Sequence, residues 1–294
     1  MIKNGVYAAG LSILNADKSL DVKSTINHAE SIIKSGLHGV FFFGSTGQSQ
    51  LISISEKKDL ISKTATSKFK KQFYFGTGVN SLKDSLDLIR YCMEYDFQTF
   101  LIMPPAYYKG NTDKGVYDFY AEIIGQIPKV KIILYNFEKL SGYLFNADAI
   151  KKLVKDFPKQ IIGCKDSSYN LFETLKIPDF KLFPGSEAKL LKGLELGCNG
   201  CISAVVNVTH SLARKVFDDF EKKKPQTINE KVIKVRETFD QYPLIPALHS
   251  FLLAEDDKYQ NLLPPLTLLD TKTREDLLNK LKEFNFTSLK NIAA

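Results

Sequence analysis

A long hydrophobic run is absent from this chain of 294 residues. The apolar patch near its N-terminus, within residues 1–20, is too short and too interrupted for a signal peptide or a membrane span. Linkers, internal repeats and low-complexity segments are also absent. These absences predict a cytoplasmic chain that has no membrane partner and no flexible break.

Cysteine and histidine are scarce, with four residues of each. Cys198 and Cys201 have the C-x-x-C spacing, but no second pair and no nearby histidine completes a zinc site. Cys92 and Cys164 are isolated in the sequence. We therefore predict small buried thiols in a reducing cytoplasm and no metal site.

Positive charge is in excess, with a formal net charge of +7. The lysines nevertheless alternate with Asp and Glu along helical segments, as in residues 56–59. The densest run, residues 221–224, falls at an expected helix end, where cations are favoured by the helix dipole. The excess therefore predicts a solvated surface that mildly attracts small anionic substrates, and no nucleic-acid partner.

Short apolar runs alternate with amphipathic helical patterns along most of the chain. Strands that are apolar throughout and separated by helices indicate a parallel sheet covered on both faces. We expect strands at residues 7–14, 39–43, 72–76, 99–103, 131–136, 161–165, 181–184 and 200–205. For two of the helices, Ser55 and Asn146 are the expected N-caps.

The number of units favours one architecture. About eight βα units in roughly 220 residues are typical of a (β/α)8 TIM barrel of the α/β class. We predict this catalytic barrel over residues 1–225 and a C-terminal helical extension, residues 226–294, packed on it. A doubly wound open sheet is the alternative, but its Gly-rich turn after the first strand is missing.

Lys165 directly follows the apolar residues of the sixth expected strand, and catalytic residues of a barrel lie at the C-terminal ends of its strands. Lysine is almost never fully buried unless it is paired. Desolvation lowers the pKa of a lysine, and the neutral amine forms Schiff bases with ketones. Lys165 is therefore either a Schiff-base lysine or an ion-pair partner of Asp166 or Glu187. Its position alone does not separate the two.

Hydroxyl groups end two other expected strands. Residues 44–47, Gly-Ser-Thr-Gly, either form an ordinary tight turn or offer N–H groups and hydroxyls to a carboxylate. Tyr135 either packs with its hydroxyl on a backbone carbonyl or faces the same rim as Lys165. Both readings stay open on the residues alone.

Several segments, in the correct order, resemble the dihydrodipicolinate synthase / N-acetylneuraminate lyase family of class I, pyruvate-dependent aldolases. They are GVFFFGSTGQ, MPPAYYKGN, ILYNFEKLSG, IIGCKDSS, FPGSE and GCNGCISAVVN. The tail around residues 263–266, Leu-Pro-Pro-Leu, also resembles the family's C-terminal region. The ordered set is specific although no single motif is, and it favours the Schiff-base role of Lys165.

The resemblance implies catalytic roles. Lys165 would condense with C2 of pyruvate, or of a 2-keto acid that releases pyruvate. Tyr135 would be the general acid/base that shuttles protons. Ser45 and Thr46 would hold the pyruvate carboxylate, and the Thr46 hydroxyl would also take part in a proton relay.

The resemblance also implies a partner subunit and a substrate channel. Tyr108 matches the tyrosine that the family inserts from a neighbouring subunit, which implies a homotetramer built as a dimer of dimers. Gly185, Glu187 and Ile202 match positions that line the substrate channel. No cofactor is implied, because the protonated imine is itself the electron sink.

Departures from the family pattern bear on the substrate. Leu140 stands where the synthases carry an arginine for the carboxylate of the aldehyde, and the adjacent Lys139 would point elsewhere. Ala188 and Ala204 replace residues that hold the glycerol tail of sialic acid, which argues against a long polyol. Glu138 replaces the proline usual after the Tyr-Asn-x turn.

We therefore expect a lyase or aldolase acting through pyruvate on a 2-keto-3-deoxy sugar acid, such as 2-keto-3-deoxygluconate. Its partners would be pyruvate and a small aldehyde or keto acid. One alternative is 4-hydroxy-tetrahydrodipicolinate synthase, which joins pyruvate and aspartate semialdehyde, with Lys139 or another cation in place of the arginine. Others are a keto-deoxy-acid dehydratase and a non-enzymatic sugar-acid-binding barrel.

Overall fold

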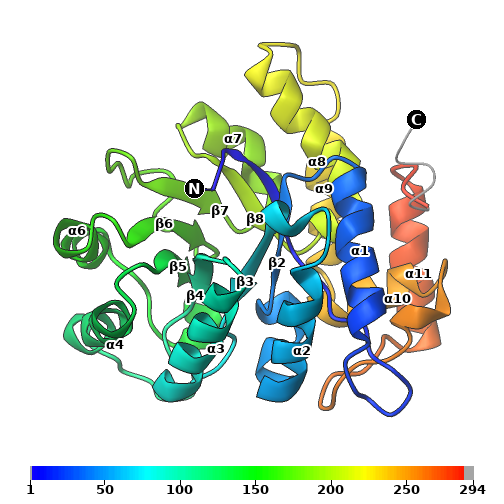
Figure 1. Ribbon diagram of the computed structural model, residues 1–294. Coiled ribbons are helices and arrows are strands. Elements are labelled where there is room, and N and C mark those ends of the chain that lie inside the picture. Colours follow the sequence, from blue (N-terminus) through cyan, green and yellow to red (C-terminus); the bar gives the residue numbers. More distant parts are fainter. Residues whose placement is uncertain (1, 288–294) are drawn as a thin grey trace.

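The computed structural model describes residues 2–287, and within them eight parallel strands alternate with helices (Figure 1). The strands are β1 Gly5–Ala9, β2 Gly39–Phe42, β3 Phe73–Gly76, β4 Thr99–Ile102, β5 Lys131–Asn136, β6 Ile161–Asp166, β7 Lys181–Pro184 and β8 Gly200–Ser203. The α-helices are α1 Val22–Lys34, α2 Ile54–Thr64, α3 Leu82–Glu94, α4 Asp113–Gln126, α5 Glu138–Ser141, α6 Ala147–Asp156, α7 Leu190–Glu195, α8 Val206–Glu221, α9 Asn229–Phe239, α10 Leu244–Leu252 and α11 Thr271–Lys282. Short 3-10 helices are η1 Ser45–Gly47, η2 Ser49–Leu51, η3 Lys70–Gln72, η4 Glu187–Lys189 and η5 Asp257–Tyr259.

The strands form a nearly closed barrel in sequence order, with β1 paired to both β2 and β8. Asn199 joins β7 to β8 at the remaining seam. Its backbone N donates to Leu182 O at 2.8 Å, and its side-chain Oδ1 accepts from Leu182 N at 2.9 Å. The predicted (β/α)8 barrel is thereby confirmed, and the open doubly wound sheet is wrong.

Side chains alternate between the inside of the barrel and the layer under the helices, because successive residues of a strand face opposite ways. The inside is filled by one buried cluster from seven of the eight strands. Its strand residues are Tyr7, Phe41, Leu101, Ile133, Tyr135, Ile162, Phe183 and Ile202. Cys164 lies instead in the larger cluster that the strands share with the helices. The register shifts by one residue at Ile162, so the alternation restarts after it, and Lys165, the next residue along β6 after Cys164, faces inward.

The C-terminal helices α9, α10 and α11 share a further buried core with the start of α8 and with Leu11 and Ile13. Figure 1 shows them as the yellow-to-red part of the chain. The predicted helices in this region are thus present. The division of the chain at residue 226 stays a prediction, and residues 288–294 of the predicted extension lie outside the described residues.

Five of the predicted strands, β2, β3, β4, β6 and β8, differ from the structure by one or two residues at one end, and two other predicted boundaries are wrong for a physical reason. The first strand was expected over residues 7–14, but β1 ends at Ala9, and Leu14 forms only an isolated bridge with Leu20. Ser55 does not cap α2. Ser53 does, because its side chain accepts from Glu56 N while the Glu56 carboxylate reaches back to Ser53 N. The predicted cap Asn146 is confirmed at α6.

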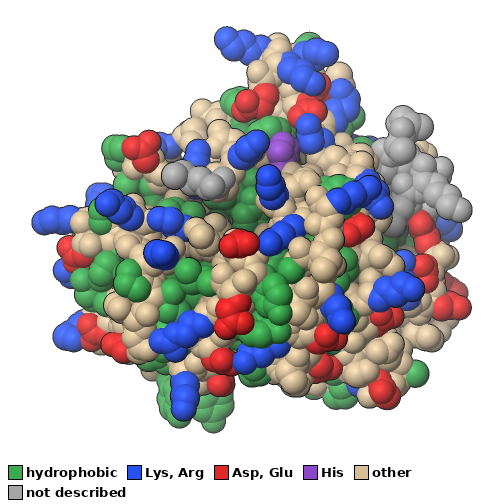
Figure 2. Space-filling view, viewed as in Figure 1, with side chains coloured by type: hydrophobic (Ala, Val, Ile, Leu, Met, Phe, Trp, Pro, Cys, Tyr) green, Lys and Arg blue, Asp and Glu red, His purple; other side chains and the backbone are tan. Residues whose placement is uncertain are grey.

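The surface carries both signs of charge. On the face that Figure 2 shows, Lys and Arg side chains are interspersed with Asp and Glu. One lysine contradicts the expectation that residues 56–59 are solvated, because Lys57 is fully buried. All four cysteines are free and buried, as predicted. No helix among residues 2–287 is long and apolar enough to span a membrane.

Candidate active site

Lys165 lies inside the barrel near the C-terminal end of β6, with 3% of its surface exposed. Its register partner on β5 is Tyr135. The Lys165 Nζ lies 4.2 Å from the centre of the Tyr135 ring. The amine and the phenol are therefore neighbours within the mouth of the barrel.

Both proposed ion-pair partners of Lys165 are engaged elsewhere. The Asp166 carboxylate accepts from the backbone N of Tyr169, Leu171 and Phe172. Glu187 forms an ion pair with Arg236. Among residues 2–287, Lys165 Nζ has no carboxylate within 4 Å and no hydrogen-bond acceptor. The structural ion pair is therefore wrong as an account of this lysine.

The Gly-Ser-Thr-Gly turn brings a hydroxyl to Tyr135. Residues Ser45–Gly47 form the 3-10 helix η1 directly after β2, and Ser45 Oγ shares a hydrogen bond of 3.1 Å with Tyr135 OH. Gly47 is required there, because a Cβ at this position would lie 2.8 Å from Gly10 O. Thr46 is buried beside Ser45 in the same turn. The turn thus brings the Ser45 hydroxyl to the end of β5, and the Thr46 hydroxyl follows one residue later in the chain.

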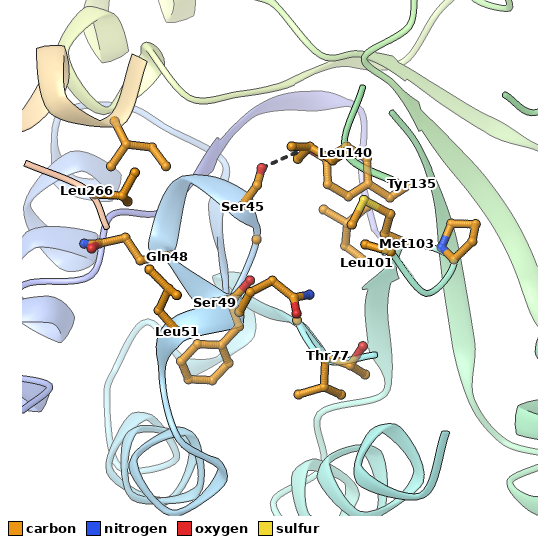
Figure 3. A pocket seen from close by; sticks show the side chains of 18 of the residues that line it. Ser45, Gln48, Ser49, Leu51, Thr77, Leu101, Met103, Tyr135, Leu140 and Leu266 are labelled. Atoms are coloured by element: carbon orange, nitrogen blue, oxygen red, sulfur yellow. Dashed lines mark hydrogen bonds between the residues drawn. The ribbon is translucent and has the colours of Figure 1, made fainter. Parts of the chain in front are cut away.

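A cavity of about 360 Å³ opens next to Ser45 and Tyr135. Figure 3 shows the Ser45–Tyr135 bond at one side of it, close to Leu140. The other lining residues are Phe43, Gly44, Gln48, Ser49, Gln50, Leu51, Thr77, Gly78, Val79, Leu101, Met103, Pro104, Ala106, Ile245, Pro265 and Leu266. None of the described lining residues carries a charge, and most are apolar.

The remaining predicted site residues lie in different environments. Ile202 is buried in the barrel-interior cluster that also contains Tyr135. Gly185 follows β7, and its N donates to Asp166 O at 2.8 Å. Leu140 is partly exposed and lines the cavity. Glu187 is fully buried and does not line that cavity. Tyr108 is 74% exposed, and its ring packs edge-on against Tyr107.

Glu187 is the centre of a buried polar network that sequence reasoning missed. Its carboxylate accepts from Ser203 Oγ and Thr209 Oγ1, and Arg236 of α9 donates to it as well. The pKa of Arg236 is raised: its burial acts to lower it, but the charge of Glu187 and the hydrogen bond and charge of Asp240 together outweigh that effect. Because Arg236 lies 49 residues further along the chain, no local spacing could reveal the pair.

Asp166 organises the loop after Lys165. Besides its three backbone donors, it accepts from Asn136 Nδ2 at 2.8 Å, and Asn136 Oδ1 accepts from Phe145 N. These bonds tie the loops after β5 and β6 together. Strand alternation could have found this role, since a residue adjacent to Lys165 must face away from it.

A metal centre is not apparent in the part of the chain that the structure describes, where no group of three or more His, Cys, Asp or Glu side chains converges. Cys198 Sγ instead donates to Phe172 O, and Cys201 is buried with its thiol pKa raised mainly by desolvation. The chemistry available at the barrel mouth is therefore that of an amine, a phenol and two hydroxyls.

A sequence model of the dihydrodipicolinate synthetase family matches residues 3–284. The chain belongs to this family. The predicted family is thereby confirmed, and so is the prediction of a lyase. At this level of detail the chain is a class I pyruvate aldolase or lyase of the dihydrodipicolinate synthetase family.

Individual relatives carry different printed activities. A 2-dehydro-3-deoxy-D-gluconate/2-dehydro-3-deoxy-phosphogluconate aldolase of Picrophilus torridus is 25% identical over 261 residues, which are 84% of this chain and 96% of that protein. A 4-hydroxy-tetrahydrodipicolinate synthase of Hydrogenobaculum sp. is 30% identical over 182 residues, which are 60% of this chain and 61% of that enzyme. These similarities do not select one substrate.

The fold is shared with solved structures of the family. Dihydrodipicolinate synthase from Agrobacterium tumefaciens superimposes with a TM-score of 0.87 at 22% identity, covering 96% of this chain and 99% of that one. At this level of sequence identity, the structural similarity shows only that the two chains share the barrel fold. The substrate has to be argued from the side chains of this chain.

Proposed function

We propose that this chain is a Schiff-base aldolase that cleaves or forms a 2-keto-3-deoxy sugar acid through pyruvate. The observation that carries the proposal is the buried Lys165 amine, which has no ion-pair partner among the described residues and lies against Tyr135. An amine in this environment is suited to attack a ketone. Membership of a class I aldolase family supports the same chemistry.

The proposed mechanism assigns a step to each group. The Lys165 amine attacks C2 of the keto acid, and the carbinolamine loses water to give a protonated imine. In the cleavage direction a base takes the proton of the C4 hydroxyl, and the C3–C4 bond breaks. Its electron pair flows to the imine nitrogen, so an aldehyde and an enamine form. Tyr135 carries protons, with its hydroxyl held by Ser45, and Ser45 and Thr46 bind the carboxylate.

The acceptor half of the substrate is proposed to be uncharged. Cleavage of 2-keto-3-deoxygluconate releases pyruvate and glyceraldehyde, and only the pyruvate half bears a carboxylate. The cavity beside Tyr135 has no charged side chain among its described lining residues, and Leu140 offers no cation. An anionic aldehyde would be left without a partner there, which disfavours its binding.

The Schiff base is tested by borohydride reduction in the presence of pyruvate, followed by peptide mass spectrometry. We expect the reduced pyruvate adduct on the peptide that contains Lys165, and none in the Lys165→Ala variant. Lys181→Ala, on the neighbouring strand β7, is the matched control and should keep the adduct. An unmodified Lys165 peptide in the wild-type protein would exclude the proposal.

The substrate is tested with a panel of aldehydes scored by pyruvate consumption. Glyceraldehyde should exceed both aspartate semialdehyde and glyceraldehyde 3-phosphate in kcat/KM. The synthase is the second candidate, because the Hydrogenobaculum relative carries that name. Faster turnover of aspartate semialdehyde than of glyceraldehyde would establish the synthase instead. Water loss from a keto-deoxy acid without aldehyde release would identify the dehydratase.

A homotetramer in the cytoplasm, built as a dimer of dimers, completes the proposal. Tyr108 lies at the rim of the barrel beside Tyr107, and both rings are largely exposed. In the proposed assembly Tyr108 contributes to the site of a neighbouring subunit. Tyr108→Ala should lower kcat. Light scattering on the same fractions should show that the mass of the assembly is unchanged. A fully active monomer would contradict the assembly and leave the Schiff-base proposal intact.

A further inference from the structure

A second buried lysine lies against the wall of the cavity. Lys57 of α2 is 0% exposed. Its Nζ donates to Gly78 O at 2.9 Å and to Thr77 O at 3.2 Å, and it lies 5.8 Å from the centre of the Phe43 ring. No carboxylate lies within 4 Å of this ammonium among residues 2–287. Two backbone carbonyl oxygens are thus its only acceptors in the described chain.

The surroundings of Lys57 are unfavourable for a charge. Burial lowers the pKa of Lys57 to about 8, and the charge of Asp84 at the start of α3 opposes this effect. Its neighbour Lys58 is more ordinary, because it is partly exposed and pairs with Asp87 at 2.7 Å. An apolar side chain could fill the space of Lys57 without the free-energy cost of removing a charge from water. What an apolar side chain could not provide is the pair of hydrogen bonds from the ammonium to the loop.

That loop is in close contact with the turn that carries Ser45. Gly78 has a φ of +58°, and a Cβ at this position would lie 2.6 Å from Ser49 Oγ and 2.8 Å from Phe43 O. Thr77 and Gly78 line the same cavity as Phe43, Ser45 and Ser49. A shift of residues 77–78 would therefore displace segment 43–49.

We propose that Lys57 is a positioning residue for the carboxylate-binding turn. Its ammonium holds the backbone of residues 77–78 against segment 43–49, and this contact fixes Ser45 and Thr46 relative to Tyr135 and Lys165. The substrate group that the contact serves is the carboxylate of a 2-keto acid. The inference rests on the proposed Schiff-base function, because it concerns how pyruvate is seated before the amine attacks.

The test measures how much pyruvate half-saturates borohydride trapping, together with KM and kcat in the aldol reaction. Lys57→Met keeps the volume of the side chain and removes the charge. We expect the half-saturating concentration and KM for pyruvate to rise about tenfold, the equivalent of one hydrogen bond to a charged group, with kcat within about twofold. Lys57→Arg keeps a donor and a charge and should restore both values to within about threefold of wild type.

The control is Lys58→Met, which removes a lysine from the same helix and should leave pyruvate saturation unchanged. A Lys57→Met protein with a lowered Tm but normal saturation by pyruvate would overturn the proposal, since the lysine would then serve stability alone. If that variant does not fold, Lys57→Gln, which keeps a donor to one carbonyl, is judged by the same measurements. Absence of trapping in the wild-type protein would instead defeat the Schiff-base function.

Discussion

At the scale of single residues, the phenol of Tyr135 is the group on which proton transfer depends. Its hydroxyl is bonded to Ser45 Oγ, and its ring lies against Lys165. Tyr135→Phe keeps the ring and removes the hydroxyl, so kcat should fall by about 10²- to 10⁴-fold, the usual range for a general acid/base. Steady-state kinetics with pyruvate and glyceraldehyde measures it. Trapping by borohydride should be slower but still complete, and unchanged turnover would remove Tyr135 from the mechanism.

Leu140 offers a gain-of-function test of the acceptor site. It is partly exposed and lines the cavity next to Tyr135. Leu140→Arg introduces a guanidinium that can bind a carboxylate by two parallel bonds. We expect kcat/KM for aspartate semialdehyde to rise at least tenfold relative to glyceraldehyde, since a bond to a charged group contributes about 1.5–3 kcal/mol. Lys139→Arg, one residue earlier, is the control and should leave the ratio within about twofold.

The burial of a single residue can be predicted from the sequence only where its immediate neighbours are also buried. The burial of Lys165 could be predicted, because an apolar strand precedes it without a break. Lys57 could not, because it stands between Glu56 and Lys58 and has the appearance of a solvated helix surface. Its burial arises from the contact of α2 with the loop after β3, which brings residues 20 positions apart together. The ion pair between Glu187 and Arg236 escaped prediction for the same reason.

At the scale of elements, the loop after β6 depends on one carboxylate. Asp166 is fully buried and accepts from three backbone N–H groups and from Asn136. Asp166→Ala leaves these donors without an acceptor, so the free energy of unfolding should fall by about 3 kcal/mol or more. Urea unfolding followed by circular dichroism measures the change. Asp148→Ala, which removes an exposed carboxylate 3.9 Å from Lys151, should cost less than about 0.5 kcal/mol.

Element boundaries were predictable where burial and strand pairing coincide. β5 and β7 match the expected residues, because the apolar run ends where the ladder ends. β1 does not, since Leu11 and Ile13 are apolar for another reason: they pack on the C-terminal helices after the chain has left the sheet. The N-cap of α2 could have been predicted correctly, because Ser53 and Glu56 have the S-x-x-E spacing of a capping box.

At the scale of the whole molecule, the order of apolar and helical segments was sufficient to predict the barrel. The contacts between the helices outside the barrel could not be predicted from that order. His28 of α1 shows why. Its Nε2 bonds to Asn207 Oδ1 of α8, and its Nδ1 bonds to Tyr259 OH of η5. Asn207 Nδ2 donates to Ala9 O and Ala204 O, so Oδ1 must accept from the ring. His28 Nε2 therefore carries the proton, and Nδ1 accepts from Tyr259.

This arrangement stabilises the neutral ring and predicts loss of stability in mild acid. Burial lowers the pKa of His28, His38, His210 and His249 to about 4, from an ordinary value of 6.5. Between these values the unfolded chain binds more protons than the folded one, so the free energy of unfolding falls as pH falls from about 6.5 towards 4.

The loss for His28 alone should be about 2 kcal/mol between pH 7.5 and pH 5. Urea midpoints measured at the two pH values test this prediction. The carboxylates with lowered pKa, such as Asp113 and Asp276, titrate below their ordinary value of 3.8 and contribute little in this window. His28→Gln removes one titrating ring, so its midpoint should depend on pH less steeply than that of the wild type. Equal slopes for the two proteins would show that His28 is not held neutral by the contact between α1, α8 and η5.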